Sequence, residues 1–223
     1  MAMKFAALLK TSALSLAFAI LAIVALQVPA GATTINFDDL NGSGHDGSLI
    51  ASPYQGYNWE NFYVLDGTQP HAGDGYHTGV VSGKNIAYNG FGNFSQITNA
   101  TPFTLDGGAF TAAYVDMNVR IRGYLNNVLV YDFYLAITTT GPTMLGAGNF
   151  ILNGVNLTDI AVDRLRFNRT GLSQVVFENL QLTAVPIPAA LPLFASALAF
   201  GGVALRRRKA ARTAARTTAL GNS

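Results

Sequence analysis

Residues 117–138 read MNVRIRGYLNNVLVYDFYLAIT, and this stretch decides the fold. Apolar and polar side chains alternate through 117–125, as they do on a strand with one buried face. Asn126 and Asn127 follow, a pair that favours a tight hairpin turn. A second strand is then expected over 128–138. The first strand places Val119 and Ile121 on one face and Arg120, Arg122 and Tyr124 on the other; the second has Leu129, Tyr131, Phe133, Leu135 and Ile137 in step.

The same alternation continues on both sides of this predicted hairpin. Residues 160–168 place Asp163, Leu165 and Phe167 opposite Val162, Arg164 and Arg166, and 174–183 predicts a last strand. Earlier strands are expected at 33–39, 57–65, 103–105 and 109–115, with a loop-rich stretch over 67–93. About ten short strands with no helix between them predict an all-β domain, an antiparallel β-sandwich spanning residues 33–184.

The N-terminus has the features of a secretory signal peptide. Lys4 and Lys10 supply positive charge, residues 12–26 are apolar, and small residues before Ala32 resemble a cleavage site. We therefore expect residues 1–32 to form a signal helix that is removed after Ala32. The alternative is an N-terminal membrane anchor. Both interpretations predict that the middle of the chain is exported across the membrane.

The C-terminus carries a second targeting segment. Pro186 and Pro188 lie in a short motif, residues 189–205 are apolar, and a basic cluster follows. Seventeen residues make a helix of about 26 Å, just enough to cross a bilayer core. The basic cluster is expected to remain in the cytoplasm, followed by a disordered tail over 210–223. The motif is Val185, Pro186, Ile187 and Pro188, and the cluster is Arg206, Arg207, Arg208 and Lys209.

This three-part order resembles the PEP-CTERM sorting signal of Gram-negative bacteria, in the branch that reads VPLPA. Ile187 stands where that branch has Leu, and the extension 210–223 goes beyond the usual end of the signal. The resemblance implies transient recognition by an exosortase, anchoring of residues 185–209 in the inner membrane, and release to the cell surface or outside. Proteins of this kind typically accompany exopolysaccharide and biofilm genes.

Charge and cysteine content exclude several classes of partner and site. The chain carries 14 basic and 12 acidic residues, but all twelve acids and only six basics lie within 33–184, which leaves that part a net charge of −6. The sequence shows no basic patch there, so we expect no nucleic-acid partner. Without cysteine, disulfides, thiolate zinc sites and cysteine nucleophiles are excluded.

The exported core resembles a jelly-roll domain of exported bacterial proteins. Its opening at 35–40, the segments 56–62 and 82–89, and the closing pair 163–167 and 177–180 carry the resemblance. The resemblance implies a jelly-roll sandwich that shares its architecture with carbohydrate-binding modules. In such modules a calcium ion often joins the first strand to the last. Here its ligands would be Asp38, Asp39, Glu178 and Asn179; the alternative is a solvated edge.

Two further groups of residues are candidate sites. Trp59 and Tyr57, with Tyr54 and Tyr63 nearby, can form an aromatic platform for a sugar ring, although alternating aromatic residues are more often core. His71, Asp74 and His77 form the one cluster of two histidines and an aspartate. Its spacing matches no known metal motif, so we expect a solvated loop there.

We find no catalytic pattern in the exported core. Glu60 and Glu178 are the only glutamates, and no Gly-x-Ser-x-Gly elbow or phosphate-binding loop is present. The sequence therefore predicts a non-enzymatic protein with a structural or adhesive role in an extracellular polysaccharide matrix or biofilm. The alternatives are a carbohydrate-binding, lectin-like module and, less favoured, a glycoside hydrolase.

Overall fold

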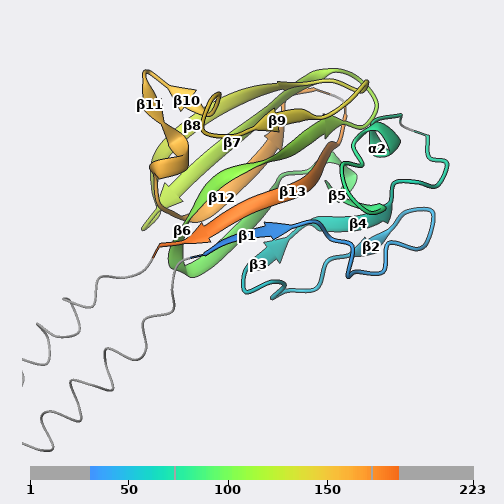
Figure 1. The fold of residues 1–223 in the computed structure, drawn as a ribbon, viewed down its shortest axis with the longest axis horizontal. Coiled ribbons are helices and arrows are strands. Elements are labelled where there is room, and N and C mark those ends of the chain that lie inside the picture. The colour runs from blue at the N-terminus through green and yellow to red at the C-terminus, as the bar shows by residue number, and fades with distance from the viewer. Residues whose placement is uncertain (1–30, 73, 172, 186–223) are drawn as a thin grey trace, which may run out of the picture. The chain divides into compact units, whose positions relative to one another are not determined.

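The computed structural model describes residues 31–185, apart from residues 73 and 172, and this part of the chain is built of antiparallel β-strands (Figure 1). The sequence-based predictions for residues 1–30 and 186–223, which include the signal helix, the transmembrane helix and the basic cluster, lie outside the described residues. Within 31–185, no helix is long and apolar enough to cross a membrane.

The described residues form thirteen strands and three short helical segments. The strands are β1 Ala32–Ile35, β2 Ser48–Leu49, β3 Asn58–Glu60, β4 Phe62–Asp66, β5 Asn85–Asn89, β6 Ser95–Ala112, β7 Met117–Leu125, β8 Val128–Ile137, β9 Thr143–Leu145, β10 Ile151–Leu152, β11 Val155–Asn156, β12 Val162–Arg169 and β13 Val175–Ala184. The helical segments are α2 Asp74–Thr78, η1 Gly90–Gly92 and η2 Leu157–Asp159.

Strand β6 belongs to both layers of the sandwich. Its first residues, 95–98, pair with β12 and β3, and residues 103–112 pair with β13, with β9 on the other side at 108–110. We call the strands β3, β12, β7 and β8, with the start of β6, the β12 layer. The strands β1, β2, β4, β5, β9 and β13, with the end of β6, form the β13 layer. The prediction of an all-β sandwich is confirmed.

The core lies between these layers and is centred on four phenylalanines. Phe62, Phe110 and Phe177 come from the β13 layer, Phe167 comes from β12, and all four are fully or almost fully buried. The Phe167 and Phe177 ring centroids are 5.0 Å apart at 70°, an edge-to-face arrangement that adds to the hydrophobic gain. Side chains from both layers therefore meet in one core.

The predicted hairpin is correct in both strands and in its turn. Asn126 and Asn127 have φ values of 51° and 64°, as a two-residue turn matching the sheet twist requires. One detail of the prediction is wrong. A bulge shifts the register between Gly123 and Tyr124, so Leu129 turns outward and is 47% exposed while Tyr131 stays buried.

A second bulge corrects the prediction for β12. The register with β6 shifts between Val162 and Arg164. Val162 therefore points into the core together with Leu165 and Phe167, and Asp163 is displaced from that row. Between Arg164 and Val162, β12 advances by two residues while its partner on β6 advances by five, from Thr98 to Phe103. A regular alternation does not anticipate such an irregularity.

The first half differs more from the prediction. The segment 57–65 is divided at Asn61, whose φ is 56°, so that β3 pairs in the β12 layer and β4 in the β13 layer. The two strands predicted at 103–105 and 109–115 are parts of the single strand β6. The stretch 67–93 contains a fully buried strand, β5, whose run NIAYN lacks the alternation of a half-buried strand, and the helix α2.

Replacing Phe167 with Ala is expected to lower the free energy of unfolding by about 3–5 kcal/mol, because the cavity lies where both layers meet. Phe91→Ala is the matched control. Phe91 is 78% exposed, so we expect a change within about 0.5 kcal/mol. Urea denaturation followed by circular dichroism measures both. Equal losses for the two variants would contradict a core centred on Phe167.

Candidate functional site

The outer face of the β13 layer carries a second, smaller hydrophobic cluster. On β4, Phe62 and Val64 point into the main core, whereas Tyr63 and Leu65 point outward. Tyr63 lies opposite Tyr88 of β5 in the strand pairing, and Tyr88 lies opposite Val176 of β13. Alternation along neighbouring strands thus places a row of apolar and aromatic side chains on the outside of the sandwich.

Helix α2 covers one side of this row because its backbone lies directly on the end of β6. Gly75 N donates to the carbonyl of Ala113 at 3.0 Å, and a Cβ at Gly75 would lie 1.8 Å from the Ala112 oxygen. Only glycine allows that approach. The contact brings Tyr76 against Tyr88 and Tyr114, with ring centroids 5.6 Å away in each case.

A pocket of about 280 Å³ opens between α2, the strands and the preceding loops. This volume is at the small end of ligand-binding pockets, which begin at about 300 Å³. Aromatic side chains form much of its wall, and polar groups from distant loops converge on it. The aromatic lining is Tyr63, Tyr76, Tyr88, Phe91 and Tyr114; the polar lining includes His45, Asp46, His71 and Gln174.

Hydrogen bonds hold the polar wall in place. His71 Nε2 lies 2.9 Å from the carbonyl oxygen of Asp66, and the rings of His45 and His71 are 6.3 Å apart. Tyr88 donates its hydroxyl to the carbonyl of Asp46, and Tyr76 donates to Gln174. Burial, and then the charge of Asp46, raise the pKa of Tyr88 to about 12. These tyrosines therefore stay neutral donors at physiological pH.

Phe91 forms the exposed rim of the pocket. It is 78% exposed and its φ is 55°, an uncommon and strained conformation for a bulky residue. Its ring makes an edge contact with Tyr63 at 5.9 Å. An apolar ring held open to solvent beside a hydrophobic cluster is available for contact with a ligand.

The prediction that Tyr57 and Trp59 form a platform for a sugar ring is wrong. Both rings are 5% exposed. Trp59 packs edge-on against Phe62 at 4.8 Å, and its indole N–H donates to the Tyr54 carbonyl at 2.8 Å. Alternation on β3 directs Trp59 into the core, so neither ring offers a face to a saccharide. Of the predicted aromatic group, Tyr63 reaches the pocket.

The histidine-rich segment is divided between two places. His71 lines the pocket, whereas His77 is exposed and its Nδ1 lies 3.1 Å from the Gly67 carbonyl. His45, from the loop before β2, is the histidine that lies beside His71 at the pocket. Aromatic residues at 63, 76, 88, 91 and 114 carried no shared signal in the sequence, because five separate segments supply them.

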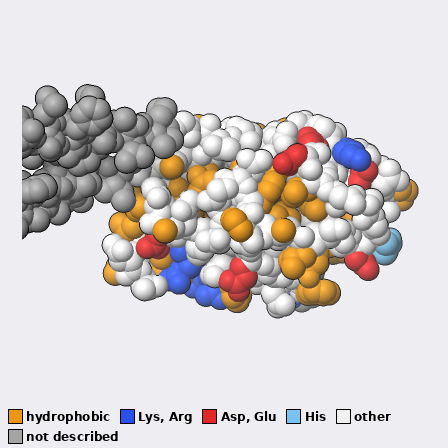
Figure 2. Space-filling view, turned by 90° about the horizontal axis from the view of Figure 1, so that it is seen from below, with side chains coloured by type: hydrophobic (Ala, Val, Ile, Leu, Met, Phe, Trp, Pro, Cys, Tyr) orange, Lys and Arg blue, Asp and Glu red, His pale blue; other side chains and the backbone are white. Residues whose placement is uncertain are grey.

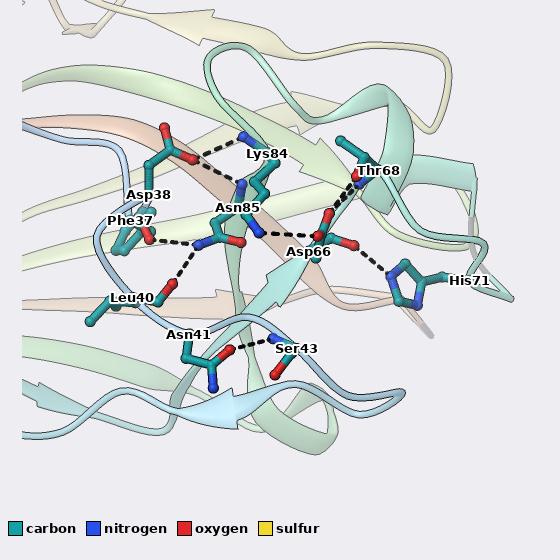
Figure 3. A network of polar contacts seen from close by, with 10 residues as sticks. All are labelled: Phe37, Asp38, Leu40, Asn41, Ser43, Asp66, Thr68, His71, Lys84 and Asn85. Carbon is teal, nitrogen blue, oxygen red and sulfur yellow. Dashed lines mark hydrogen bonds and ion pairs between the residues drawn. The ribbon is translucent and has the colours of Figure 1, made fainter.

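A polar network joins the end of β1 to the start of β5 (Figure 3). Asp38 Oδ1 accepts hydrogen bonds from the backbone N–H groups of Lys84, at 2.9 Å, and Asn85, at 3.0 Å. The Asn85 side chain donates to the carbonyls of Phe37 and Leu40. A Cβ at Gly83, whose φ is +54°, would lie 1.9 Å from the Asp38 carboxylate. The carboxylate therefore requires glycine at this turn.

Glu178 lies near this network and is fully buried. Strand β13 has a register shift here, and Asn179 has a φ of 49°. The hydroxyl of Ser82 lies 2.9 Å from Glu178 Oε1 and 3.1 Å from Asn179 Oδ1, while Glu178 Oε2 has no partner. Burial raises the pKa of Glu178 to about 7, hydrogen bonding to Ser82 lowers it, and the nearby Asp38 charge raises it.

The structure brings together part of the predicted calcium set. β1 pairs with β13 over Ala32–Ile35, as the calcium prediction requires, and Asp38, Glu178 and Asn179 lie near that pairing. Asp39 turns away: its carboxylate accepts from the Tyr54 hydroxyl at 2.6 Å. The described residues contain no group of three or more histidine, aspartate or glutamate side chains arranged to hold a metal. Hard oxygens without partners, at Glu178 Oε2 and Asn85 Oδ1, nevertheless suit calcium.

Comparisons with known proteins assign neither a family nor a ligand. No family model and no curated protein matches the chain. A crystal structure of a DUF4465 family protein from Bacteroides caccae aligns with it at a TM-score of 0.46 and 10% sequence identity, covering 70% of this chain and 100% of that one.

Glu178→Gln is expected to change the pH dependence of stability. Because the folded-state pKa of Glu178 is raised from 4.5 to about 7, the folded protein binds the proton more tightly than the unfolded chain. The wild type should lose up to about 3 kcal/mol of unfolding free energy as pH rises through this window. The glutamine side chain of the variant cannot ionise. The unfolding free energy of the variant minus that of the wild type should therefore rise from about pH 5 to about pH 8. Urea titrations at each pH measure the difference, and a constant difference would contradict it.

Calcium provides the second arm of this experiment. If calcium binds Glu178 and Asp38, millimolar calcium should raise the wild-type melting temperature most at about pH 8, where the cation need not displace a proton. Glu178→Gln and Asp38→Ala should remove the shift, and Asp39→Ala should retain it. Identical melting curves in calcium and in chelator would rule out the calcium site and leave a protonated carboxyl.

Proposed function

We propose that this chain is an exported, exosortase-sorted protein of an extracellular polysaccharide matrix, and that its pocket binds a saccharide. The observation that carries the proposal is the pocket on the outer face of the β13 layer. Aromatic walls with a few convergent hydrogen-bonding groups are the usual composition of a small-molecule site. Pyranose rings combine apolar C–H faces with hydroxyl edges, and this pocket offers partners for both.

The polar groups of the pocket favour binding to a neutral sugar. His45, His71, Asp46 and Gln174 can donate to or accept from hydroxyl groups, because each carries at least one nitrogen or oxygen suited to that role. The volume suits a single ring or the end of a chain. A lectin-like adhesive module is therefore favoured over a purely structural component, and the two roles are compatible in a matrix protein.

Hydrolysis is less well supported than binding. Glycoside hydrolysis generally uses two carboxyl groups on either side of the scissile bond. Asp46 supplies the only carboxyl group in the pocket lining described here. Glu178, with its raised pKa, belongs to the network at the β1–β13 pairing and does not line the pocket. We therefore propose a protein that holds a saccharide without cleaving it.

The proposed fold type is a jelly-roll-like sandwich. Support comes from β6, which crosses between the layers, and from β1, which lies beside the last strand β13. The proposed export rests on the signal-like segment 1–32 and on the sorting motif, hydrophobic run and basic cluster of 185–209.

Tyr63→Ala and Phe91→Ala are expected to weaken saccharide binding by about tenfold or more, equivalent to about 1.4 kcal/mol each. The reason is that each variant removes a ring from the pocket wall. Tyr134→Ala is the control: it removes an exposed tyrosine outside the pocket. A panel of neutral mono- and oligosaccharides, with affinity measured by calorimetry, provides the test. Equal effects of Tyr134→Ala and Tyr63→Ala, or no saccharide bound at all, would overturn the role of the pocket.

Processing of the tail is tested on protein secreted by a host that carries an exosortase. We expect mass spectrometry to find a mature form that ends near Pro188 and lacks Arg206–Lys209, because the signal is read at the membrane before release. Pro186→Ala together with Pro188→Ala should leave the chain in the membrane fraction. Intact peptides from 206–223 in the extracellular fraction would contradict sorting by cleavage.

A further inference from the structure

The outer face of the β12 layer gathers most of the positive charge of the exported part. Arg120 and Arg122 alternate along β7, and Arg164 and Arg166 alternate along the neighbouring β12. The sequence showed six scattered basic residues and no patch, yet four of them share this face, which we call the arginine face. Figure 2 shows several basic side chains grouped at one place on the visible surface, with a further basic side chain near the opposite end.

The central pair of the arginine face is electrostatically unfavourable as it stands. Arg166 lies directly opposite Arg122 in the antiparallel pairing, and like charges in that position destabilise a sheet. The Nε atoms of both side chains are buried and have no hydrogen-bond partner. A buried donor without a partner is destabilising. A bound anion would offset the repulsion between the two guanidinium charges.

Neighbouring side chains hold the guanidinium groups in position without neutralising most of them. Arg166 stacks over Phe94 at 3.5 Å and Arg164 over Tyr124 at 4.4 Å. Arg122 donates to the Asn168 amide oxygen at 2.7 Å. Arg120 forms an ion pair with Asp132, which also lies opposite Arg122 in the β7–β8 pairing. Arg164 and Arg166 form no ion pair among the described residues, and their aromatic neighbours hold them in fixed, pre-organised orientations.

We propose that the arginine face binds an acidic polysaccharide through its carboxylate groups. Arginine recognises carboxylates with two parallel hydrogen bonds, and the face places Arg122 directly opposite Arg166 on the neighbouring strand, with their Cβ atoms about 5 Å apart. A uronic-acid polymer presents a carboxylate at each repeat, and its C–H faces can contact Tyr124. The inference is independent of the saccharide pocket, which lies on the other layer.

Charge argues against a nucleic acid as the occupant. Duplex DNA carries a negative charge per about 1.7 Å of its axis, and the exported part of this chain carries a net charge of −6. Long-range repulsion would oppose approach to so dense a polyanion. A polyuronate has a lower charge density and requires only local complementarity with the arginine face.

The test measures binding of polygalacturonate by the protein produced from the full chain, at low salt. Arg122→Gln with Arg166→Gln should weaken binding at least tenfold. The matched control is Lys84→Gln with Arg169→Gln, which removes the same charge elsewhere and should change affinity less than about twofold. Wild-type binding should weaken toward about 0.15 M salt, and methyl-esterified polygalacturonate should bind at least tenfold more weakly.

Several outcomes would overturn the proposal. Equal losses in the two double variants would show unspecific charge attraction, and equal binding of the esterified polymer would exclude carboxylate recognition. Binding of duplex DNA as tight as binding of polygalacturonate would assign the face to polyanions in general. Melting temperatures verify folding; removal of the opposed arginine pair should not lower them. Tyr63→Ala should retain polygalacturonate binding, which distinguishes this site from the pocket.

Discussion

The fold depends on one constraint: strand β6 must satisfy hydrogen bonds in both layers. Residues 95–98 pair in the β12 layer and 103–112 in the β13 layer, so one continuous backbone connects both sides of the core. Phe103 and Phe110 of this strand are fully buried. The break at Asn61 repeats the arrangement on a smaller scale, because β3 pairs in one layer and β4 in the other. These connections hold the two layers face to face, so that each covers the apolar face of the other.

The two outer faces differ because different side chains alternate with the buried ones in each layer. On the β13 layer, tyrosines from β4 and β5 face outward, and α2 with the 45–47 loop encloses them. On the β12 layer, the outward row is arginine supported by aromatic rings. One sandwich thus carries a small aromatic pocket and a flat cationic face. We propose a carbohydrate partner for each, neutral for the pocket and acidic for the arginine face.

Glu178 is an ionisable residue that the fold buries, and burial makes its charged form unfavourable. Its carboxyl group lies at the bulge where the edge of β13 changes partner from β5 to β1. Burial disfavours its charged form, and a proton or a cation is the natural means of offsetting that cost. The network of Asp38, Asn85 and Ser82 around it anchors the first strand. We therefore expect this junction to link pH, and calcium where it binds, to the stability of the sandwich.

The sequence by itself determined the all-β class and the β7–β8 hairpin with its Asn126–Asn127 turn, because alternation and turn residues act locally. Asp38 and Glu178 became candidates only through the resemblance to jelly-roll modules. Only the tertiary structure decided which residues share a surface. Register shifts beside Gly123 and Val162 changed the predicted faces of Leu129 and Val162. Pairing across distant strands buried Trp59, joined His45 to His71 and placed Arg122 opposite Arg166. Register and layer assignment arise from long-range hydrogen bonding and core packing, which local periodicity does not encode.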